Sequence, residues 1–287
     1  MLYLLTASFI WAFSFGIIKG KLINIDPNVV SFLRILISFI LFIPLLKLKK
    51  IKNKQILLHL LAIGAIQFGL MYVAYIYSFR LLKAYEVALF TILTPIYVTI
   101  INDLMVKRFD YIALISSMLA IIGAGVIAYT RIGQSEFITG ILIVQASNIC
   151  FAIGQIYYKK VMVKHSSIQN SDIFAIMYFG ALIVTGTFTF VYSDWKHVSL
   201  NMDQFMSIIY LGVIASGLGF YLWNTGARIT KVSTLSVMNN IKIPIAVLCS
   251  IFIFSEEADW PRLLIGGLLM LISVIVSEKY SFPKYIA

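Results

Sequence analysis

Residues 232–254 read VSTLSVMNNIKIPIAVLCSIFIF, an apolar stretch long enough for one helix to cross a lipid bilayer. Lys242 and Pro244 lie near its centre. A charged side chain at that depth costs about 2.5–3.5 kcal/mol on insertion scales, so it is retained where it is paired, faces water or loses its proton. The stretch therefore predicts a transmembrane helix that carries a functional residue.

The whole chain has the composition of a membrane protein. Hydrophobic residues make up 61% of its 287 residues and charged residues 12%, against about 45–50% and about 25% in soluble domains. A soluble core could not bury so much apolar surface, whereas lipid removes the need to bury it. The net charge of +11 is scattered between apolar runs, which argues against a nucleic-acid partner. Both cysteines lie inside apolar runs and predict neither a disulfide nor a metal site.

Nine further apolar windows accompany the first, and short polar loops separate all ten. We therefore predict an all-α integral membrane protein with ten transmembrane helices, surrounded by the lipid bilayer and without a soluble domain. The first window lacks a basic leader and a cleavage site, so we expect a retained helix. The windows are 2–19, 28–47, 56–79, 84–106, 111–130, 137–158, 171–192, 204–227, 232–254 and 261–278.

The basic residues indicate how the chain is oriented. Fourteen Lys and Arg residues lie in the C-terminal tail and in the loops after even-numbered windows, and seven lie in the other loops. Cytoplasmic loops carry the excess of basic residues. We therefore expect both termini to be cytoplasmic, in a bacterial cytoplasmic (inner) membrane.

An internal repeat divides the chain into two parts. An offset of 149 residues aligns Pro95 with Pro244 and Asp110 with Asp259 without gaps. We predict one repeat in residues 1–132 and a second in residues 133–287, each with five spans. Because five is odd, the second half must be inverted relative to the first, which is typical of transporters.

Several short segments succeed one another in a specific order. They are Trp11-Ala12-Phe13-Ser14-Phe15, Phe32-Leu33-Arg34, the Pro95 and Pro244 segments, Phe254-Ser255-Glu256 and Gly266-Gly267. In these the chain resembles the drug/metabolite transporter superfamily, specifically its EamA-type ten-helix members. Lys107-Arg108 departs from the acidic pair that the second half keeps as Glu256-Glu257. The resemblance implies transport or efflux of amino acids, carboxylates or related metabolites and fixes no substrate.

Paired prolines point to a site near mid-membrane. A proline inside a helix removes one donor and displaces the carbonyl four residues earlier, which here belongs to Thr91 for Pro95 and to Asn240 for Pro244. Interruptions at corresponding places in the two halves are the best sequence indication of a transporter's binding site. The alternative is a packing kink that neighbouring helices satisfy.

Lys242 is the most informative single residue. It shares one face of the predicted helix with Ser236, Asn239, Ala246 and Ser250, at three- and four-residue steps. We interpret its ammonium as an anchor for the carboxylate of an anionic or zwitterionic substrate. The alternative is a structural ion pair, for example with Glu86.

Other polar and aromatic residues in windows 56–79, 137–158 and 204–227 predict a shared cavity. Each one alone is more often an interhelical contact than a ligand contact. With residues from the first and ninth windows, the predicted substrate-binding set is Trp11, Tyr72, Tyr75, Gln145, Asn148, Tyr221, Trp223, Asn224, Asn239, Asn240 and Lys242.

Arg34 and Glu86 are expected nearer the outer ends of their windows. They form a candidate gate or coupling pair, with a plain structural salt bridge as the alternative. Glu86 beside an apolar neighbour is the candidate proton carrier, which makes protons a candidate coupling ion. No metal-ligand cluster, catalytic triad or phosphate-binding loop occurs in the sequence, so we expect no cofactor and no enzymatic activity.

These observations favour a secondary transporter or exporter of amino acids, carboxylates or related small metabolites that works by alternating access. Uptake or exchange of a nucleotide-linked metabolite is the first alternative, although phosphates would require more than one deep cation. A lipid-handling protein or a membrane-embedded enzyme is the second.

Overall fold

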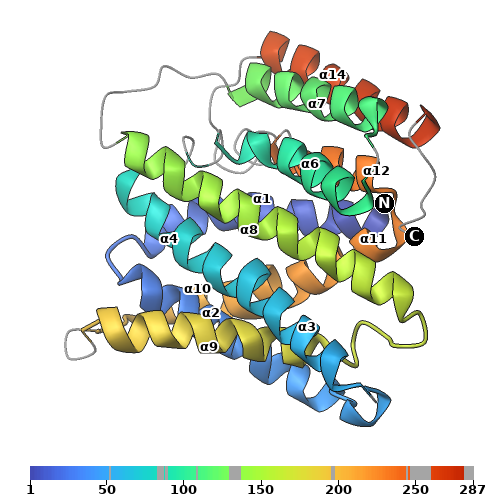
Figure 1. Cartoon of the computed structure of the whole chain (residues 1–287). Helices are drawn as coiled ribbons and strands as arrows, with labels where there is room; N and C mark the ends of the chain where they lie inside the picture. The colour runs from blue at the N-terminus through green and yellow to red at the C-terminus, as the bar shows by residue number, and fades with distance from the viewer. Residues whose placement is uncertain are drawn as a thin grey trace.

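The computed structural model of the chain describes residues 1–51, 53–82, 87, 90–107, 109–128, 137–194, 198–243, 245 and 260–280. Throughout these ranges the secondary structure is helical and no strand occurs (Figure 1). The elements are α1 (Leu2–Lys21), α2 (Pro27–Phe42), η1 (Ile43–Leu45), η2 (Leu48–Lys50), α3 (Lys54–Gly64), η3 (Ala65–Leu70), α4 (Met71–Leu81), η4 (Thr91–Leu93), α6 (Thr94–Val106), α7 (Tyr111–Ala128), α8 (Phe137–Lys164), α9 (Phe174–Tyr192), α10 (Met202–Tyr210), η6 (Leu211–Leu218), α11 (Gly219–Ile229), α12 (Val232–Met238) and α14 (Trp260–Tyr280).

Six helical segments are long and apolar enough to cross a membrane. They are Pro27–Leu45, Lys54–Leu81, Ile138–Lys164, Phe174–Tyr192, Met202–Ile229 and Trp260–Ser277. Three shorter apolar helices accompany them, at Leu2–Ile18, Thr91–Val106 and Tyr111–Gly123. The predicted all-helical membrane class is confirmed. The count of ten spans stays a prediction, because much of the stretch 232–254 lies outside the described residues.

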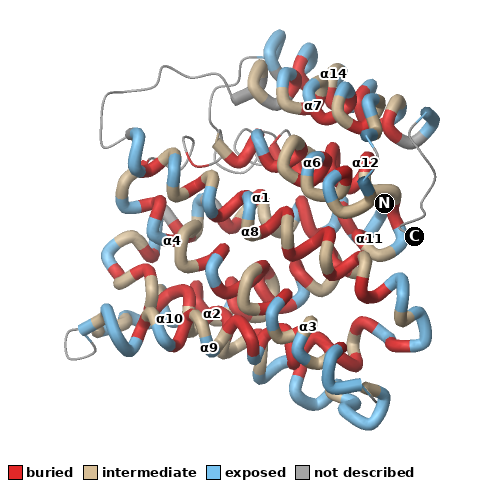
Figure 2. Tube along the Cα trace, viewed as in Figure 1, coloured by how far each residue is buried: buried red, intermediate tan, exposed pale blue. Residues whose placement is uncertain are grey.

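Buried residues gather inside the bundle and exposed residues lie toward its outside (Figure 2), where many of the exposed side chains are large and apolar. Ile138, Phe190 and Leu264 each expose about two thirds or more of their surface, which suits a lipid environment and no aqueous one. Helices α3 and α9 approach so closely that a Cβ on Gly64 would collide with the carbonyl oxygen of Met177. Small residues at such crossings let the helices pack closely. Within lipid this packing drives helix association, because the hydrophobic effect does not.

Two wide turns interrupt otherwise continuous helices. Helices α3 and α4 join through the π-helical segment η3, and α10 and α11 join through the π-helical segment η6. Side chains from other helices donate to carbonyls of η6: the Trp11 indole to Ala215 at 2.9 Å and the Tyr178 hydroxyl to Ser216 at 2.7 Å. Such π-helical turns are frequent at functional sites.

The α-helical structure is interrupted at two further places, which are about 149 residues apart in the sequence. Residues 91–93 form a single 3₁₀ turn before α6, with Pro95 in the first turn of that helix. After α12, the N–H groups of residues 239–241 donate to carbonyls only three residues earlier, so the α-helix has ended. The side chain of Asn240 donates to the carbonyl of Ile92 at 2.9 Å and joins the two breaks. The position of Pro244 lies outside the described residues.

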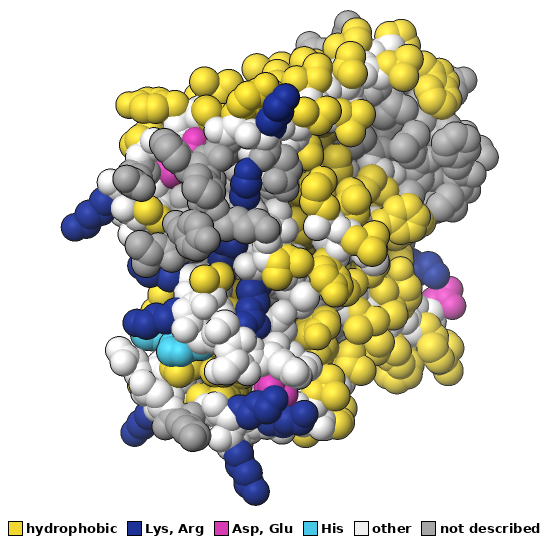
Figure 3. Space-filling view, turned by 90° about the vertical axis from the view of Figure 1, so that its right-hand side faces the viewer, with side chains coloured by type: hydrophobic (Ala, Val, Ile, Leu, Met, Phe, Trp, Pro, Cys, Tyr) yellow, Lys and Arg dark blue, Asp and Glu magenta, His cyan; other side chains and the backbone are white. Residues whose placement is uncertain are grey.

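Basic side chains gather on one end of the bundle, where few acidic side chains are visible (Figure 3). Chain segments at this end include the start of α3, the end of α8 and the connection between α2 and α3, on the right in Figure 1. Among the described residues of these segments, the exposed basic ones are Lys47, Lys49, Lys50, Lys54 and Lys164.

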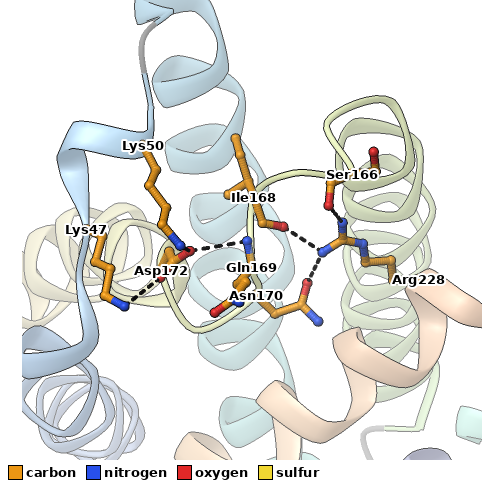
Figure 4. A network of polar contacts seen from close by, with 8 residues as sticks. All are labelled: Lys47, Lys50, Ser166, Ile168, Gln169, Asn170, Asp172 and Arg228. Atoms are coloured by element: carbon orange, nitrogen blue, oxygen red, sulfur yellow. Dashed lines mark hydrogen bonds and ion pairs between the residues drawn. The ribbon is translucent and has the colours of Figure 1, made fainter.

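A polar network holds the loops together at this end (Figure 4). Asp172, in the loop between α8 and α9, pairs with Lys50 at 2.7 Å and Lys47 at 3.6 Å, and its side chain is fully buried. Arg228 donates to the carbonyls of Ser166 and Ile168 in the same loop. Burial alone would raise the pKa of Asp172, but hydrogen bonds from Lys50 and from a backbone N–H outweigh it and hold the pKa below its usual value.

Candidate functional site

A cavity lies between helices from both parts of the chain, with an empty volume of about 560 Å³ that includes the space opening to solvent. Helices α1, α2, α4, α6, α8 and α11 contribute to its walls, together with the two helix breaks. The described residues that line it are Trp11, Ser14, Arg34, Met71, Tyr72, Tyr75, Thr91, Thr94, Ser147, Asn148, Phe151, Phe220 and Lys242.

Arg34 is the best-defined cation of this cavity. Asp26 caps α2 by accepting hydrogen bonds from two backbone N–H groups, and Arg34 comes two turns later. Its side chain is only 1% exposed, donating from Nε to Ser216 at 3.1 Å and from Nη2 to the Tyr72 hydroxyl at 2.7 Å. The guanidinium also lies over the Tyr72 ring, 4.6 Å from its centroid. Within the described residues, Nη1 has no hydrogen-bond partner.

Lys242 is the second cation that lines the cavity. In the part of the chain that the structure describes, its ammonium forms no hydrogen bond or ion pair. The predicted polar face through Ser236, Asn239 and Lys242 stays a prediction, because α12 ends at Met238 and residues 239–241 continue in tighter 3₁₀-type turns. Ser236 bonds the carbonyl of Pro95 at 2.6 Å.

The described lining residues give the cavity a net positive charge. Its described lining holds one arginine and one lysine and includes no Asp or Glu. The predicted partner Glu86 lies outside the described residues, so the pairing of Arg34 with Glu86 stays a prediction. A buried cation that lacks an anion costs free energy, which an anionic ligand would recover.

Aromatic rings form an apolar wall of the same cavity. Trp11 packs against Phe220 with ring centroids 5.3 Å apart and against Phe151 at 5.8 Å. Polar groups complete the lining, among them the Asn148 amide, which donates to the carbonyl of Phe90 at 2.9 Å. An apolar wall with a few placed polar groups is the usual build of a small-molecule site.

Seven of the residues singled out from the sequence lie together in this cavity: Trp11, Arg34, Tyr72, Tyr75, Thr91, Asn148 and Lys242. Arg34 was expected nearer the outer end of its helix, and the structure places it in the cavity with Lys242. Others lie outside the lining and contact neighbouring helices instead.

The remaining amides and aromatic residues have partners within the protein. Asn224 and Gln67 exchange two hydrogen bonds, at 2.8 and 3.1 Å, and both are fully buried. A satisfied amide pair of this kind joins two helices and leaves little for a ligand. The further contacts are Trp223 to Gln155, Gln155 to Asn239, Asn240 to Ile92, Tyr97 to Gln145, and the Tyr221 ring against Phe42 and Phe174.

Six lining residues were absent from the predicted substrate-binding set: Ser14, Met71, Thr94, Ser147, Phe151 and Phe220. Helical spacing could have found some of them. Phe151 comes three positions after Asn148 and Met71 precedes Tyr75 by four, so each shares a face with a predicted residue. The prediction relied on polarity, and polarity does not mark the apolar wall.

Comparison with known proteins agrees with this architecture. A biotin transporter of Escherichia coli (strain K12) is 35% identical over 286 residues, which cover 99% of this chain and 95% of that protein. A probable biotin transporter of Pseudomonas aeruginosa is 34% identical over 280 residues, 97% of each chain. A probable amino-acid metabolite efflux pump of Escherichia coli (strain K12) is 26% identical and covers 93% of this chain and 91% of its own.

A solved crystal structure has the same fold, with a TM-score of 0.75 at 15% identity over 96% of this chain and 95% of that one. The EamA-like transporter family matches residues 1–129 and 138–278, which is nearly the whole chain. With its apolar membrane helices, this protein is a multi-pass membrane transporter that belongs to the EamA-like transporter family.

Proposed function

We propose that the protein carries biotin, or a monocarboxylate of similar shape, across a bacterial cytoplasmic membrane by alternating access. The observation that carries the proposal is the cavity in which Arg34 and Lys242 meet no acidic side chain among the described lining residues. The relatives named biotin transporters support this choice of carboxylate.

The chemistry of biotin suits this lining. Biotin has one carboxylate on an apolar chain and a fused ring system with a polar ureido group. The free Nη1 of Arg34 and the ammonium of Lys242 can both donate to a carboxylate, and charge-assisted hydrogen bonds are about twice as strong as neutral ones. The wall of Trp11, Phe151 and Phe220 offers apolar contact to the chain and rings.

Amino-acid metabolites are the second candidate, supported by the relative named an efflux pump for them. A zwitterion would bring its own ammonium group into a cavity that already holds Arg34 and Lys242. Like charges in a low-dielectric site repel one another. The described lining therefore favours an anion over the zwitterion that the sequence left equally open.

The two-part architecture is included in the proposal. Residues 1–132 and 133–287 would form inverted halves of five spans each, with both termini cytoplasmic. Support comes from the paired π-helical segments, from the paired breaks near residues 91 and 240, and from the basic end face (Figure 3).

Counterflow in proteoliposomes tests the substrate. Vesicles preloaded with unlabelled biotin should accumulate radiolabelled biotin, while vesicles preloaded with an amino acid or a nucleotide should not. Protein-free vesicles are the control. Accumulation driven by amino acids or nucleotides and not by biotin would contradict the proposal and favour the corresponding alternative.

A further inference from the structure

A second hollow lies on the outside of the bundle, separate from the central cavity. It encloses about 1270 Å³, including the space that opens outward. Leu70 at the end of η3 and one face of α4, at positions 73, 74, 77 and 80, form its length, where three- and four-residue steps place side chains together. The described residues that line it are Asp26, Pro27, Asn28, Leu70, Val73, Ala74, Tyr77, Arg80, Ile143, Ala146, Cys150, Phe188 and Tyr192.

We propose that this groove binds the acyl chain of an anionic phospholipid, with the lipid phosphate at Arg80. The lining from Leu70 to Ala74 is apolar and so are the facing positions Ile143 and Ala146 on α8. In a bilayer no water fills such a hollow, so a lipid chain is its natural occupant.

The length of the groove matches one leaflet. Leu70, at the end of η3, and Arg80, on α4, are ten positions apart, which at about 1.5 Å per residue span about 15 Å. The hydrocarbon core of a bilayer is about 30 Å thick, so the groove runs from about its midplane to its surface. Arg80 lies in the last turn of α4, at the same end of the bundle as Pro27, where α2 begins.

The outer end of the groove has the side chains of a membrane interface. Tyr77 and Tyr192 are exposed there, and tyrosines concentrate at the level of the lipid headgroups. Arg80 is exposed and forms no ion pair with a described residue. The one acidic group of the described lining, Asp26, already accepts bonds from the start of α2 and from Ser193. Arg80 is thus available to a phosphate.

Native mass spectrometry of the full-length protein with added phosphatidylglycerol tests the proposal. The wild type should retain one phosphatidylglycerol, and Ala74→Trp, which fills the groove, should lose it. Leu264→Trp, on an exposed apolar position of α14, is the matched control and should retain the lipid. Ala146→Val, a smaller change on the facing helix, should also weaken retention. It replaces Ala74→Trp as the test variant if Ala74→Trp does not fold.

The headgroup contact has its own variant. Arg80→Gln should lower the preference for phosphatidylglycerol over phosphatidylcholine by about fivefold, the equivalent of about 1 kcal/mol for one arginine near anionic lipid. Equal retention by wild type and both groove-filling variants would overturn the proposal. So would a dimer that Ala74→Trp dissociates, because a second copy of the chain would then occupy the groove.

Discussion

Buried charge is handled in opposite ways at two places in this molecule. At the basic end face, the buried carboxylate of Asp172 is paired with Lys47 and Lys50 and fixes two loops together. In the central cavity, Arg34 and Lys242 line the wall without an acidic residue among the described lining residues. The charge of Asp172 is compensated within the protein, and the proposed anionic substrate would compensate the cavity cations.

This difference separates structural charge from functional charge. Removing a partner from a finished ion pair leaves the other charge without compensation and lowers stability. Removing a cavity cation breaks no ion pair among the described residues, and it deprives the proposed ligand of its partner. The same kind of substitution should therefore have opposite consequences in the two regions.

The largest effect is expected at Arg34. Arg34→Gln removes a charged donor from the cavity, and a hydrogen bond to a charged group contributes about 1.5–3 kcal/mol, so the Kd for biotin should rise about 10- to 150-fold. Arg34→Lys keeps the charge without the planar fork and should give an intermediate Kd. Calorimetric titration of purified protein measures both. Lys164→Gln, at the exposed end of α8, is the control, and an unchanged Kd for Arg34→Gln would remove Arg34 from the site.

A smaller effect on binding is expected at Lys242, combined with an unchanged or higher Tm. Lys242→Met should weaken biotin binding about tenfold, because a single charge-assisted contact of about 1.4 kcal/mol is lost. Its Tm should stay the same or rise, because a cation without a described partner leaves a low-dielectric cavity. Thermal unfolding and ligand titration on the same sample check this. A lowered Tm would show that Lys242 has a structural partner.

The smallest effect is expected at Asp172. Asp172→Asn should lower stability by about 1 kcal/mol near neutral pH and leave biotin transport intact, because its lysine partners are 40% and 60% exposed. Thermal unfolding and proteoliposome uptake measure the two properties. Lys50→Gln should cost more stability than Lys47→Gln, whose ammonium is farther from the carboxylate.

The effect at Asp172 should also depend on pH in a defined direction. Because the folded protein holds this pKa below its usual value, the carboxylate stabilises the fold above the unfolded pKa of about 3.9 and loses that contribution as pH falls through the lower folded value. The Tm difference between wild type and Asp172→Asn should therefore close as the pH falls below about 4. A difference that stays constant down to about pH 2 would contradict it.

The apolar windows predicted the helices well because length and composition alone decide what lies in lipid. Faces within the helices were harder to predict. A face drawn at 3.6 residues per turn assumes an unbroken helix, whereas α12 ends at Met238, four residues before Lys242, so the face through Lys242 stays a prediction. For the same reason the positions across η3 separate: Gln67 pairs with Asn224, whereas Tyr75 lines the cavity.

The sequence alone also did not show how deep a side chain lies in the bundle or which residue it contacts. Arg34 lies seven residues, or about 10 Å, inside a helix that begins at Pro27, which is deep enough to reach the cavity. Asn224 and Asn148 are the same residue type within similar stretches of apolar sequence. Only packing shows that Asn224 is satisfied by Gln67 and that Asn148 lines the cavity.

The π-helical segments η3 and η6 have a consequence for how the length of these helices can change. A wide turn accommodates an extra residue, so the helix on either side keeps its rotational phase. Loss of one residue within Ala65–Leu70 would tighten the turn and leave Tyr72 aimed at the cavity. Loss of one residue beyond it would rotate the rest of the helix by about 100°. Single-residue gaps between relatives should therefore fall within these two turns.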